Sequence, residues 1–279
     1  MNIKLHHFAF LIVAYFTSTL CFALANTAPS LADIPYGADK LQTIDIYLPQ
    51  APQAAPVIFM VHGGAWSMGD KSSSAVVKNK VQHWVKQGFI FISVNYRLLP
   101  EADPLKQLDD IANALAFSQR NAKSWGGDVN QFILMGHSAG AHLVSLLSTL
   151  PSLAQEKGIQ SVLATISLDS AAYDIEKIMS NNPPRFYKKA FGSQPDYWRK
   201  SSPQHVINHK IAPFLAVCST QRKDNSCVQA KSFTDKAASL GAQVKVVEVD
   251  LSHREVNMKL GNNNNYTQQV DAFIQSVLP

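Results

Sequence analysis

The sequence is poor in charged side chains and contains no internal repeat. Only 16% of its 279 residues are Asp, Glu, Lys or Arg, whereas 46% are hydrophobic, and this balance excludes an intrinsically disordered chain. With 13 Gly and 14 Pro, the composition also excludes collagen-like and multi-span membrane proteins. The basic excess is small, 25 Lys and Arg against 20 Asp and Glu, and no long basic run occurs. We therefore expect no nucleic-acid partner.

The first 25 residues have the pattern of a secretory signal peptide. Lys4 precedes an apolar stretch over residues 8–24, and small residues at Ala23 and Ala25 complete a cleavage pattern. An uncleaved anchor is the alternative, but the apolar stretch contains three hydroxyl residues and is short for a bilayer span. We expect cleavage, no stable membrane span afterwards, and an exported protein of residues 26–279 that is periplasmic or secreted.

Cysteine is also scarce, and two of the three cysteines lie outside this segment. Cys218 and Cys227 are nine positions apart. Because an exported chain meets an oxidising compartment, these two residues are candidates for a disulfide. Two unpaired, buried thiols are the alternative, since spacing alone does not establish that the geometry permits a bridge.

Apolar runs alternate with helical patterns from residue 42 to the end. Unbroken apolar runs, as strands buried on both faces require, occur at 57–61, 89–94, 132–135, 162–166 and 214–217. Leucine-rich stripes at helical spacing lie between them, a half-exposed strand is expected near 244–249, and a final helix near 267–278. This order predicts an α/β fold with a mostly parallel central sheet flanked by helices. Residues 171–210, rich in proline and aromatic residues, break the rhythm and predict a small cap insertion.

Residues 136–140 read Gly-His-Ser-Ala-Gly between a buried strand and a leucine-striped helix. This is the context of a nucleophile elbow, in which the Ser138 hydroxyl projects above the sheet. A serine needs a base to take its proton, and His253, just after the last expected strand, is the candidate. A tight turn that merely contains a serine is the alternative for the motif on its own.

Residues 62–66 read His-Gly-Gly-Ala-Trp directly after the first buried strand. Two successive glycines allow the N–H groups of Gly64 and Ala65 to point at a developing oxyanion, together with the N–H of Ala139. An ordinary glycine-rich strand exit is the alternative when this motif stands alone.

The histidine needs a carboxylate to orient it, and Asp224 is our choice. It follows the strand at 214–217 and so lies at the same edge of the sheet as Ser138 and His253. Asp250, Asp169 and Asp174 are alternatives, and Asp224 is otherwise a solvated loop acid beside Arg222 and Lys223. A Cys218–Cys227 bridge would stiffen the loop that carries Asp224.

Taken together, these motifs resemble an α/β-hydrolase of the bacterial lipase and esterase kind with an HGG oxyanion loop. The resemblance covers most of the chain after residue 25 and includes the stretches 94–101, 108–110 and 201–203. It implies catalytic roles for Ser138, Asp224 and His253. The absence of the long N-terminal cap of the hormone-sensitive-lipase type leaves residues 171–210 as the lid, which is closer to feruloyl and acetyl-xylan esterases and to arylformamidases.

We therefore expect a serine carboxylesterase that forms an acyl-enzyme and acts on short-acyl or aryl esters, possibly linked to carbohydrate. No metal or organic cofactor is expected. An arylformamidase is an alternative, and so is a non-catalytic binding module on a hydrolase scaffold. The expected substrate partner is a small-molecule or carbohydrate-linked ester. Four aromatic or flexible side chains are expected in the substrate pocket: Trp66, Met68, Tyr96 and Tyr173.

Overall fold

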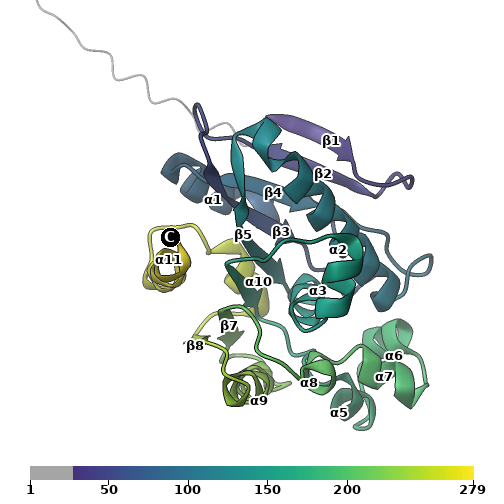
Figure 1. Ribbon diagram of the computed structural model, residues 1–279. Coiled ribbons are helices and arrows are strands. Elements are labelled where there is room, and N and C mark those ends of the chain that lie inside the picture. The colour runs from purple at the N-terminus through teal and green to yellow at the C-terminus, as the bar shows by residue number, and fades with distance from the viewer. Residues whose placement is uncertain (1–27) are drawn as a thin grey trace, which may run out of the picture.

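The computed structural model describes residues 28–279, whose strands form one mostly parallel sheet covered by helices (Figure 1). The expected signal peptide and its cleavage site lie outside the described residues. Along the sheet the eight described strands follow the order β1 (Leu31–Pro35), β2 (Thr43–Tyr47), β4 (Ile90–Val94), β3 (Ala55–Val61), β5 (Gly127–His137), β6 (Ala164–Leu168), β7 (Phe214–Ser219) and β8 (Val244–Val249). The six strands from β3 to β8 pair in parallel, while β1 and β2 are antiparallel to their neighbours.

The buried apolar runs of the sequence form the centre of this sheet. Each of the five expected runs coincides with a parallel strand, and the half-exposed run at 244–249 is the edge strand β8. Neither β1 nor β2 was among the strands expected from the sequence, and β1 carried no sequence signal. Four of its five residues are exposed, and it pairs with β2 alone, so it has no apolar face that would mark it as a strand.

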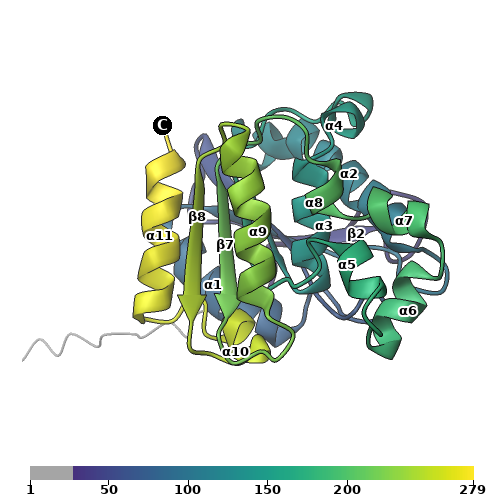
Figure 2. The same ribbon diagram turned by 90° about the horizontal axis from the view of Figure 1, so that it is seen from below.

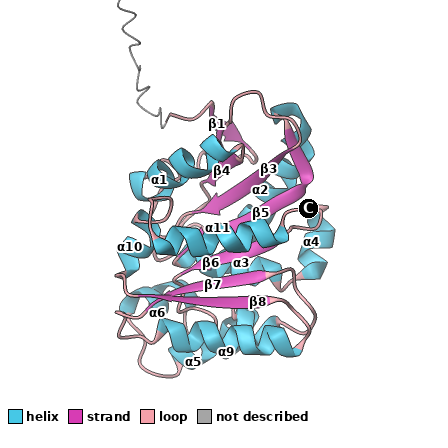
Figure 3. Cartoon of the chain, turned by 90° about the vertical axis from the view of Figure 1, so that its left-hand side faces the viewer, coloured by secondary structure: helices cyan, strands magenta, loops and turns pink. Residues whose placement is uncertain are grey.

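Helices cover both faces of the sheet. Helices α1 (Ser74–Trp84) and α11 (Asn265–Val277) lie on one face, in front of the strands in Figure 3, with α10 (His253–Met258) beside α1. Helices α2 (Pro104–Asn121), α3 (Ala139–Ser148) and α9 (Ser226–Ser239) cover the other face, and Figure 2 shows α9 and α11 on opposite sides of β7 and β8. The shorter helical segments are η1 (Val85–Gln87), η2 (Ala122–Trp125) and α4 (Pro151–Lys157). Of the leucines in the predicted stripes, Leu108 and Leu115 of α2 and Leu143, Leu146 and Leu147 of α3 are buried, whereas Leu105 is partly buried.

The expected cap region, 171–210, contains four short helices and no strand. They are α5 (Ile175–Met179), α6 (Arg185–Phe191), α7 (Pro195–Lys200) and α8 (Pro203–Val206). Helix α8 lies against α3 and α9, and the other three helices extend to one side of α9 (Figure 2). The Trp66 ring, on the loop after β3, packs 4.8 Å from the Phe191 ring and 5.5 Å from the Tyr187 ring. This aromatic contact places the inserted helices against the end of the sheet that carries the predicted site.

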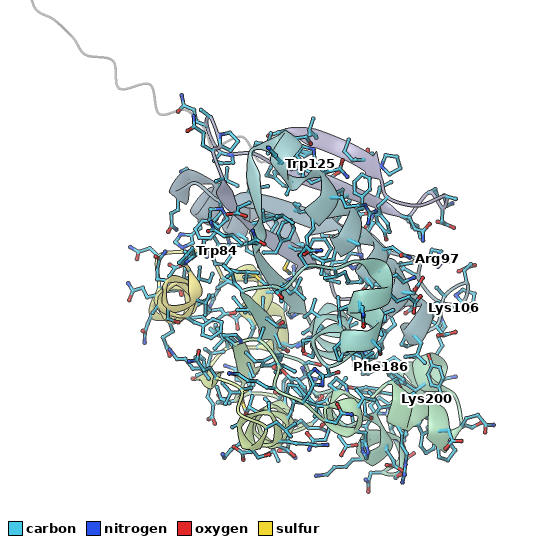
Figure 4. All side chains as sticks on the ribbon, viewed as in Figure 1. Trp84, Arg97, Lys106, Trp125, Phe186 and Lys200 are labelled. Atoms are coloured by element: carbon cyan, nitrogen blue, oxygen red, sulfur yellow. A yellow bond between two sulfur atoms is a disulfide. The ribbon has the colours of Figure 1, made fainter. Side chains whose placement is uncertain are left out.

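A partly buried ion pair connects two of the motifs on which the family resemblance rested. Arg97, on the loop after β4 and labelled in Figure 4, places its guanidinium on the fully buried carboxylate of Asp110 in α2. Its Nε lies 2.9 Å from Oδ2 and its Nη2 lies 2.6 Å from Oδ1. This two-point geometry fixes the loop relative to α2, because both planar groups are constrained at once.

Candidate active site

Ser138 lies on a sharp turn between the end of β5 and the start of α3. Its φ of 58° is in the left-handed region, an unusual conformation for a residue that is not glycine. The flanking glycines are required by close packing: a Cβ on Gly136 would lie 2.4 Å from the Gly140 carbonyl oxygen, and one on Gly140 would lie 2.2 Å from that of Val61. The strained turn and its glycines form the nucleophile elbow that the sequence predicted.

His253 is brought to this serine by the loop that follows β8. It is the first residue of α10, and its Nε2 lies 2.9 Å from the Ser138 Oγ. A capping box begins the helix, because Ser252 accepts the backbone N–H of Glu255 and the Glu255 carboxylate accepts that of Ser252. The predicted pairing of nucleophile and base is therefore present in the geometry.

The carboxylate on the other side of the imidazole belongs to Asp169, directly after β6. Its Oδ2 lies 2.6 Å from His253 Nδ1, and its Oδ1 accepts the backbone N–H of Ser219 at 2.9 Å. Burial alone would raise the pKa of Asp169, but the hydrogen bond from His253, the nearby Arg222 charge and the Ser219 N–H together lower this pKa to about 2. Asp169 is consequently an ionised carboxylate in a fully buried position.

The expectation that Asp224 would orient His253 is wrong in this structure. Asp224 forms a two-point ion pair with Arg222, and its side chain is 45% exposed. The Arg222 guanidinium lies between Asp224 and the imidazole, with Nη1 at 2.7 Å from the Asp169 carbonyl oxygen and 3.0 Å from His253 Nδ1. Asp224 is thus held one side chain away from the histidine.

Cys218 and Cys227 form a disulfide in the structure, as the sequence allowed. The bridge joins the end of β7 to the start of α9 and closes the loop that carries both Arg222 and Asp224. It therefore restrains the position from which the guanidinium reaches Asp169. The sequence analysis assigned this restraint to the wrong member of the loop, because Arg222 was treated only as a neighbour of Asp224.

The glycine-rich loop after β3 lies against the nucleophile elbow. A Cβ on Gly63 would approach the Ser138 Cβ to 2.9 Å, and one on Gly64, whose φ is +131°, would clash with the Met68 carbonyl group. Within the described residues, the N–H groups of Gly64 and Ala65 donate no hydrogen bond to protein. Ala139 begins α3, where the backbone N–H has no acceptor in the helix. All three line the cavity at Ser138 and are available to an anion.

A cavity of about 590 Å³ opens over Ser138 and His253. Two of the four expected pocket residues, Trp66 and Met68, line it, together with Phe186 and Tyr187 of α6 (Phe186 is labelled in Figure 4). The other lining residues include two that the sequence analysis did not single out, Arg254 and Asn257. With its aromatic and thioether walls, the cavity suits a small apolar or aryl group beside the reacting carbonyl.

The expected pocket roles of Tyr96 and Tyr173 are not supported, because both side chains are buried outside the cavity. Tyr96 stacks on the His62 ring and donates its hydroxyl to the His62 carbonyl oxygen at 2.9 Å. Tyr173 stacks on Phe233, and its hydroxyl lies 2.6 Å from that of Ser167. Their aromatic character serves packing, which a sequence pattern does not distinguish from ligand contact.

His137, next to the nucleophile, is a structural neighbour of the base. It is buried, and its Nε2 lies 3.0 Å from the His253 carbonyl oxygen. Burial, with the nearby His253, lowers the pKa of His137 to about 3, so its ring stays neutral. Its side chain therefore supports the position of His253 and does not act as a second base.

Residues 28–279 contain no group of His, Cys, Asp and Glu side chains arranged to hold a metal ion. In the same part of the chain, no helix combines the length and the apolar character needed to cross a bilayer.

A serine on a strained strand-to-helix turn, a histidine after the last parallel strand and a buried aspartate that orients it define this molecule as an α/β-hydrolase. The chain belongs to the BD-FAE family, whose sequence profile matches residues 44–236.

The chain is similar to several curated proteins. It is 25% identical to esterase LipC of Mycobacterium tuberculosis over 77% of this chain and 57% of that protein. It is 25% identical to isoprenylcysteine alpha-carbonyl methylesterase ICME of Arabidopsis thaliana, over 77% and 54% of the two chains. A kynurenine formamidase from Meyerozyma guilliermondii is 29% identical, over 72% and 78%. The chain thus spans about half the length of the first two relatives.

Solved structures with the same fold include a truncated carbohydrate esterase from gut microbiota, with a TM-score of 0.75 and 19% identity, over 91% of this chain and 98% of that one. The apo form of Thermogutta terrifontis esterase 2 has a TM-score of 0.72 and 18% identity, over 88% and 95%. At these identities the likeness concerns the fold.

Proposed function

We propose that the protein is a serine carboxylic-ester hydrolase that acts on short-acyl or aryl esters through an acyl-enzyme. The observation that carries this proposal is the 2.9 Å contact between Ser138 Oγ and His253 Nε2, beside the free N–H groups of Gly64 and Ala65. The names of LipC and ICME, both esterases, support the same reaction class.

In the acylation step, Ser138 Oγ attacks the ester carbonyl carbon while His253 Nε2 accepts the hydroxyl proton. The carbonyl oxygen becomes an oxyanion and accepts hydrogen bonds from the N–H groups of Gly64, Ala65 and Ala139. When the tetrahedral intermediate collapses, the C–O bond to the alcohol breaks and His253 returns its proton to the departing alkoxide. The products are free alcohol and an ester of Ser138.

In the deacylation step, water attacks the Ser138 ester and gives one proton to His253 Nε2. Collapse releases the carboxylic acid, and the imidazole returns the proton to Ser138 Oγ. In both steps the ionised Asp169 accepts a hydrogen bond from the Nδ1–H group of His253, which keeps Nε2 free to act as a base and stabilises the imidazolium. Protonation of His253 in acid should therefore suppress turnover.

The wall formed by α6 and the Met68 loop supports a small acyl or aryl group. Met68 and Phe186 are among the exposed large apolar side chains, and both line the cavity. A carbohydrate-linked alcohol is part of the proposal, supported by the fold shared with the gut carbohydrate esterase. A panel of p-nitrophenyl esters of graded acyl length, with feruloyl and acetylated sugar esters, measures this preference directly.

A fluorophosphonate probe tests the reaction class. It should label the wild-type protein on Ser138 and should leave Ser138→Ala unlabelled, because the probe needs an activated serine hydroxyl. A wild-type protein that is neither labelled nor active on any ester of the panel would support the binding-module alternative instead.

A second candidate activity, formamide hydrolysis, is favoured by one observation. The Meyerozyma relative named kynurenine formamidase shares 29% identity and is covered over 78% of its own length. The same serine and histidine would then cleave a C–N bond, with His253 protonating the leaving amine. Adding N-formylkynurenine to the panel decides between the two, since kcat/KM for it should stay well below that for the best ester.

We also propose that the protein is exported. The signal-like residues 1–25 and the Cys218–Cys227 disulfide support an oxidising compartment. Expression of the full chain, followed by fractionation and mass determination, should find a processed chain outside the cytoplasm that begins near Asn26. Full-length protein that stays with the cytoplasmic or membrane fraction would contradict this proposal.

A further inference from the structure

Lys80 is a buried cation that the ester-hydrolysis mechanism does not use. It lies on α1, and only 1% of its surface is exposed. Its Nζ lies 2.6 Å from the carbonyl oxygen of Asn257, 2.8 Å from the Asn257 Oδ1 and 3.0 Å from the carbonyl oxygen of Ala75. No Asp or Glu of the described residues forms an ion pair with it. An unpaired buried charge is costly, so its three acceptors need an explanation.

The acceptors match the protonated form of the side chain. An ammonium group has three N–H donors, and each of the three oxygens around Nζ can accept one of them. A neutral amine has two N–H donors and could donate to only two of these three oxygens. The contacts therefore depend on the proton that Lys80 carries.

Two of these acceptors belong to α10, the six-residue helix that begins with His253. The last carbonyl groups of a helix have no partner within it. Here each is satisfied from outside: Tyr266 Oη donates to Val256, Lys80 Nζ to Asn257 and Asn79 Nδ2 to Met258. Two of the three donors are neighbours on α1, so α1 fixes the C-terminal end of the helix.

The link from this contact to the site is short. Asn257 lies four positions after His253, one helical turn away, and it also lines the active-site cavity. The turn after α10 is packed tightly on α1, since a Cβ on Gly261 would lie 2.4 Å from the Asn79 carbonyl oxygen. A shift of α10 relative to α1 would consequently move the imidazole away from Ser138.

We propose that Lys80 is a positioning residue whose ammonium group holds α10 in place and so keeps His253 against Ser138, and that loss of its proton loosens this contact. The proposal rests on the ester-hydrolysis function proposed above. It adds a second ionisation to the activity, on the alkaline side, which the serine, histidine and aspartate do not supply.

Among the titratable groups around α10, Lys80 is the one expected to change its protonation state as the pH rises above neutral. Burial lowers the pKa of Lys80 to about 7. His137, on β5, stays neutral, and burial raises the pKa of Tyr266, on α11, far above this range. Glu255 of α10 pairs with Lys259, the residue that follows this helix. Asp271 of α11 contacts His83 of α1. Arg254, also on α10, lines the cavity.

We expect kcat/KM to rise as His253 loses its proton and to fall as Lys80 loses its own. The fall should be about 10-fold to 100-fold, the size expected for a misplaced catalytic group. Unfolding would not explain it: a lysine with a lowered pKa makes the folded protein bind fewer protons than the unfolded chain between pH 7 and about 10.4, so its titration raises stability over that interval. Thermal melts at each pH check this.

Lys80→Met keeps the apolar stem and removes the ionisation. At pH values where wild-type Lys80 is protonated, we expect its kcat/KM to fall to the alkaline level of the wild type, with no alkaline limb remaining. Lys78→Met, at an exposed position of the same helix, is the matched control and should keep the wild-type profile. If Lys80→Met lowers activity by the same factor at every pH and keeps the alkaline limb, Lys80 is only a packing residue.

A measurement on the wild-type chain covers the case in which Lys80→Met does not fold. With ¹³Cε-labelled lysine, one resonance should titrate with the midpoint of the alkaline limb, well below the usual range of lysine. The other buried lysine does not interfere, because its hydrogen bonds to Asp33 and Asp45 raise the pKa of Lys71. All lysines titrating near 10 would overturn the proposal. Fluorophosphonate labelling at pH 6.5 separates this failure from failure of the esterase function itself.

Discussion

Asp169 and Asp224 follow neighbouring parallel strands, contact the same arginine and line the same cavity, yet only one of them touches the imidazole. Asp169 comes directly after β6, the strand next to β5, and its side chain is fully buried. Asp224 lies five residues beyond β7, in a loop that reaches solvent. The comparison shows that the carboxylate placed directly after a strand contacts the imidazole, whereas the one farther along a loop does not.

Arg222 decides how the two acids are used. Its guanidinium bonds the Asp169 main chain on one side and the Asp224 carboxylate on the other. The positive charge of Arg222 favours the ionised form of Asp169. Asp224 is a counter-ion of Arg222 and does not contact the imidazole. Four changes test this division, and their expected effects on activity decrease in order.

Asp169→Asn should reduce kcat by about 10³- to 10⁴-fold, because an amide no longer holds the imidazole in the tautomer that leaves Nε2 free. Burst kinetics with a p-nitrophenyl ester measure the effect on acylation. Ser138→Ala provides the baseline of lost activity. A loss below tenfold would assign the catalytic carboxylate elsewhere.

The same variant has a stability signature. Since the pKa of Asp169 in the folded chain, about 2, lies below its usual value of 3.8, the ionised group stabilises the fold above about pH 4, and this contribution disappears as the pH falls toward 2. The difference corresponds to about 2 kcal/mol. Urea unfolding from pH 2 to pH 5 should therefore show a shallower pH dependence for Asp169→Asn than for the wild type.

Arg222→Gln should reduce kcat/KM by about 10- to 100-fold, the cost of losing a hydrogen-bonded charge beside a buried carboxylate. Arg254→Gln, at the same cavity without contact to Asp169, is the control for a general effect of charge. A loss of kcat/KM in Arg222→Gln no larger than that in Arg254→Gln would show that Arg222 only supports the loop.

Asp224→Asn should lower kcat/KM by less than about fivefold, since it removes one partner of a partly exposed ion pair and leaves the imidazole contacts intact. Measured beside Asp169→Asn, this variant is the sharpest comparison of the two acids. The reverse order of effects would restore Asp224 as the catalytic acid.

Cys218→Ala combined with Cys227→Ala should change kcat least and stability more. The bridge joins residues nine positions apart, and its removal should lower the free energy of unfolding by about 2 to 3 kcal/mol. In a chain of this size, that loss lowers Tm by about 4 to 10 °C. Calorimetry of the double variant and of the reduced wild type should agree. A large loss of kcat at 25 °C, well below either Tm, would mean that the bridge places Arg222 more strictly than the ion pairs do.

The sequence carried enough information to predict the parallel sheet, the elbow at Ser138 and its pairing with His253. These features depend on apolar runs that end in short, stereotyped turns, so the local pattern determines where each side chain points. The acid was different. Asp169 and Asp224 both follow strands. Which of them orients the histidine depends on the position of the Arg222 guanidinium, which separates Asp224 from the imidazole ring. That position is set by the fold and leaves no local pattern in the sequence.

Two further features escaped prediction for related reasons. Tyr96, Tyr173 and the cavity residue Tyr187 are all buried tyrosines, and only their places in the fold show that Tyr187 alone of the three lines the cavity. Lys80 is one lysine among many in the sequence, and only the fold shows that it reaches the Asn257 carbonyl group near the end of α10.

For the choice between Asp169 and Asp224, the sequence did contain one indication. Arg222 lies two residues before Asp224, and this spacing was a sign that Asp224 had another partner.

The loop after β3 packs so closely on the nucleophile elbow that there is no room for a Cβ at Gly63 or Gly140. The two sides of the site therefore differ in how well they tolerate substitutions. The floor of the site, formed by the loop after β3 and the elbow, consists of backbone packed on backbone. A substitution there would disrupt the fold before it could change the substrate selectivity. The roof, made by Met68 and the short helices between β6 and β7, is built from side chains at the surface. Directed evolution toward bulkier acyl groups should accordingly accumulate its changes in the roof and leave the floor untouched.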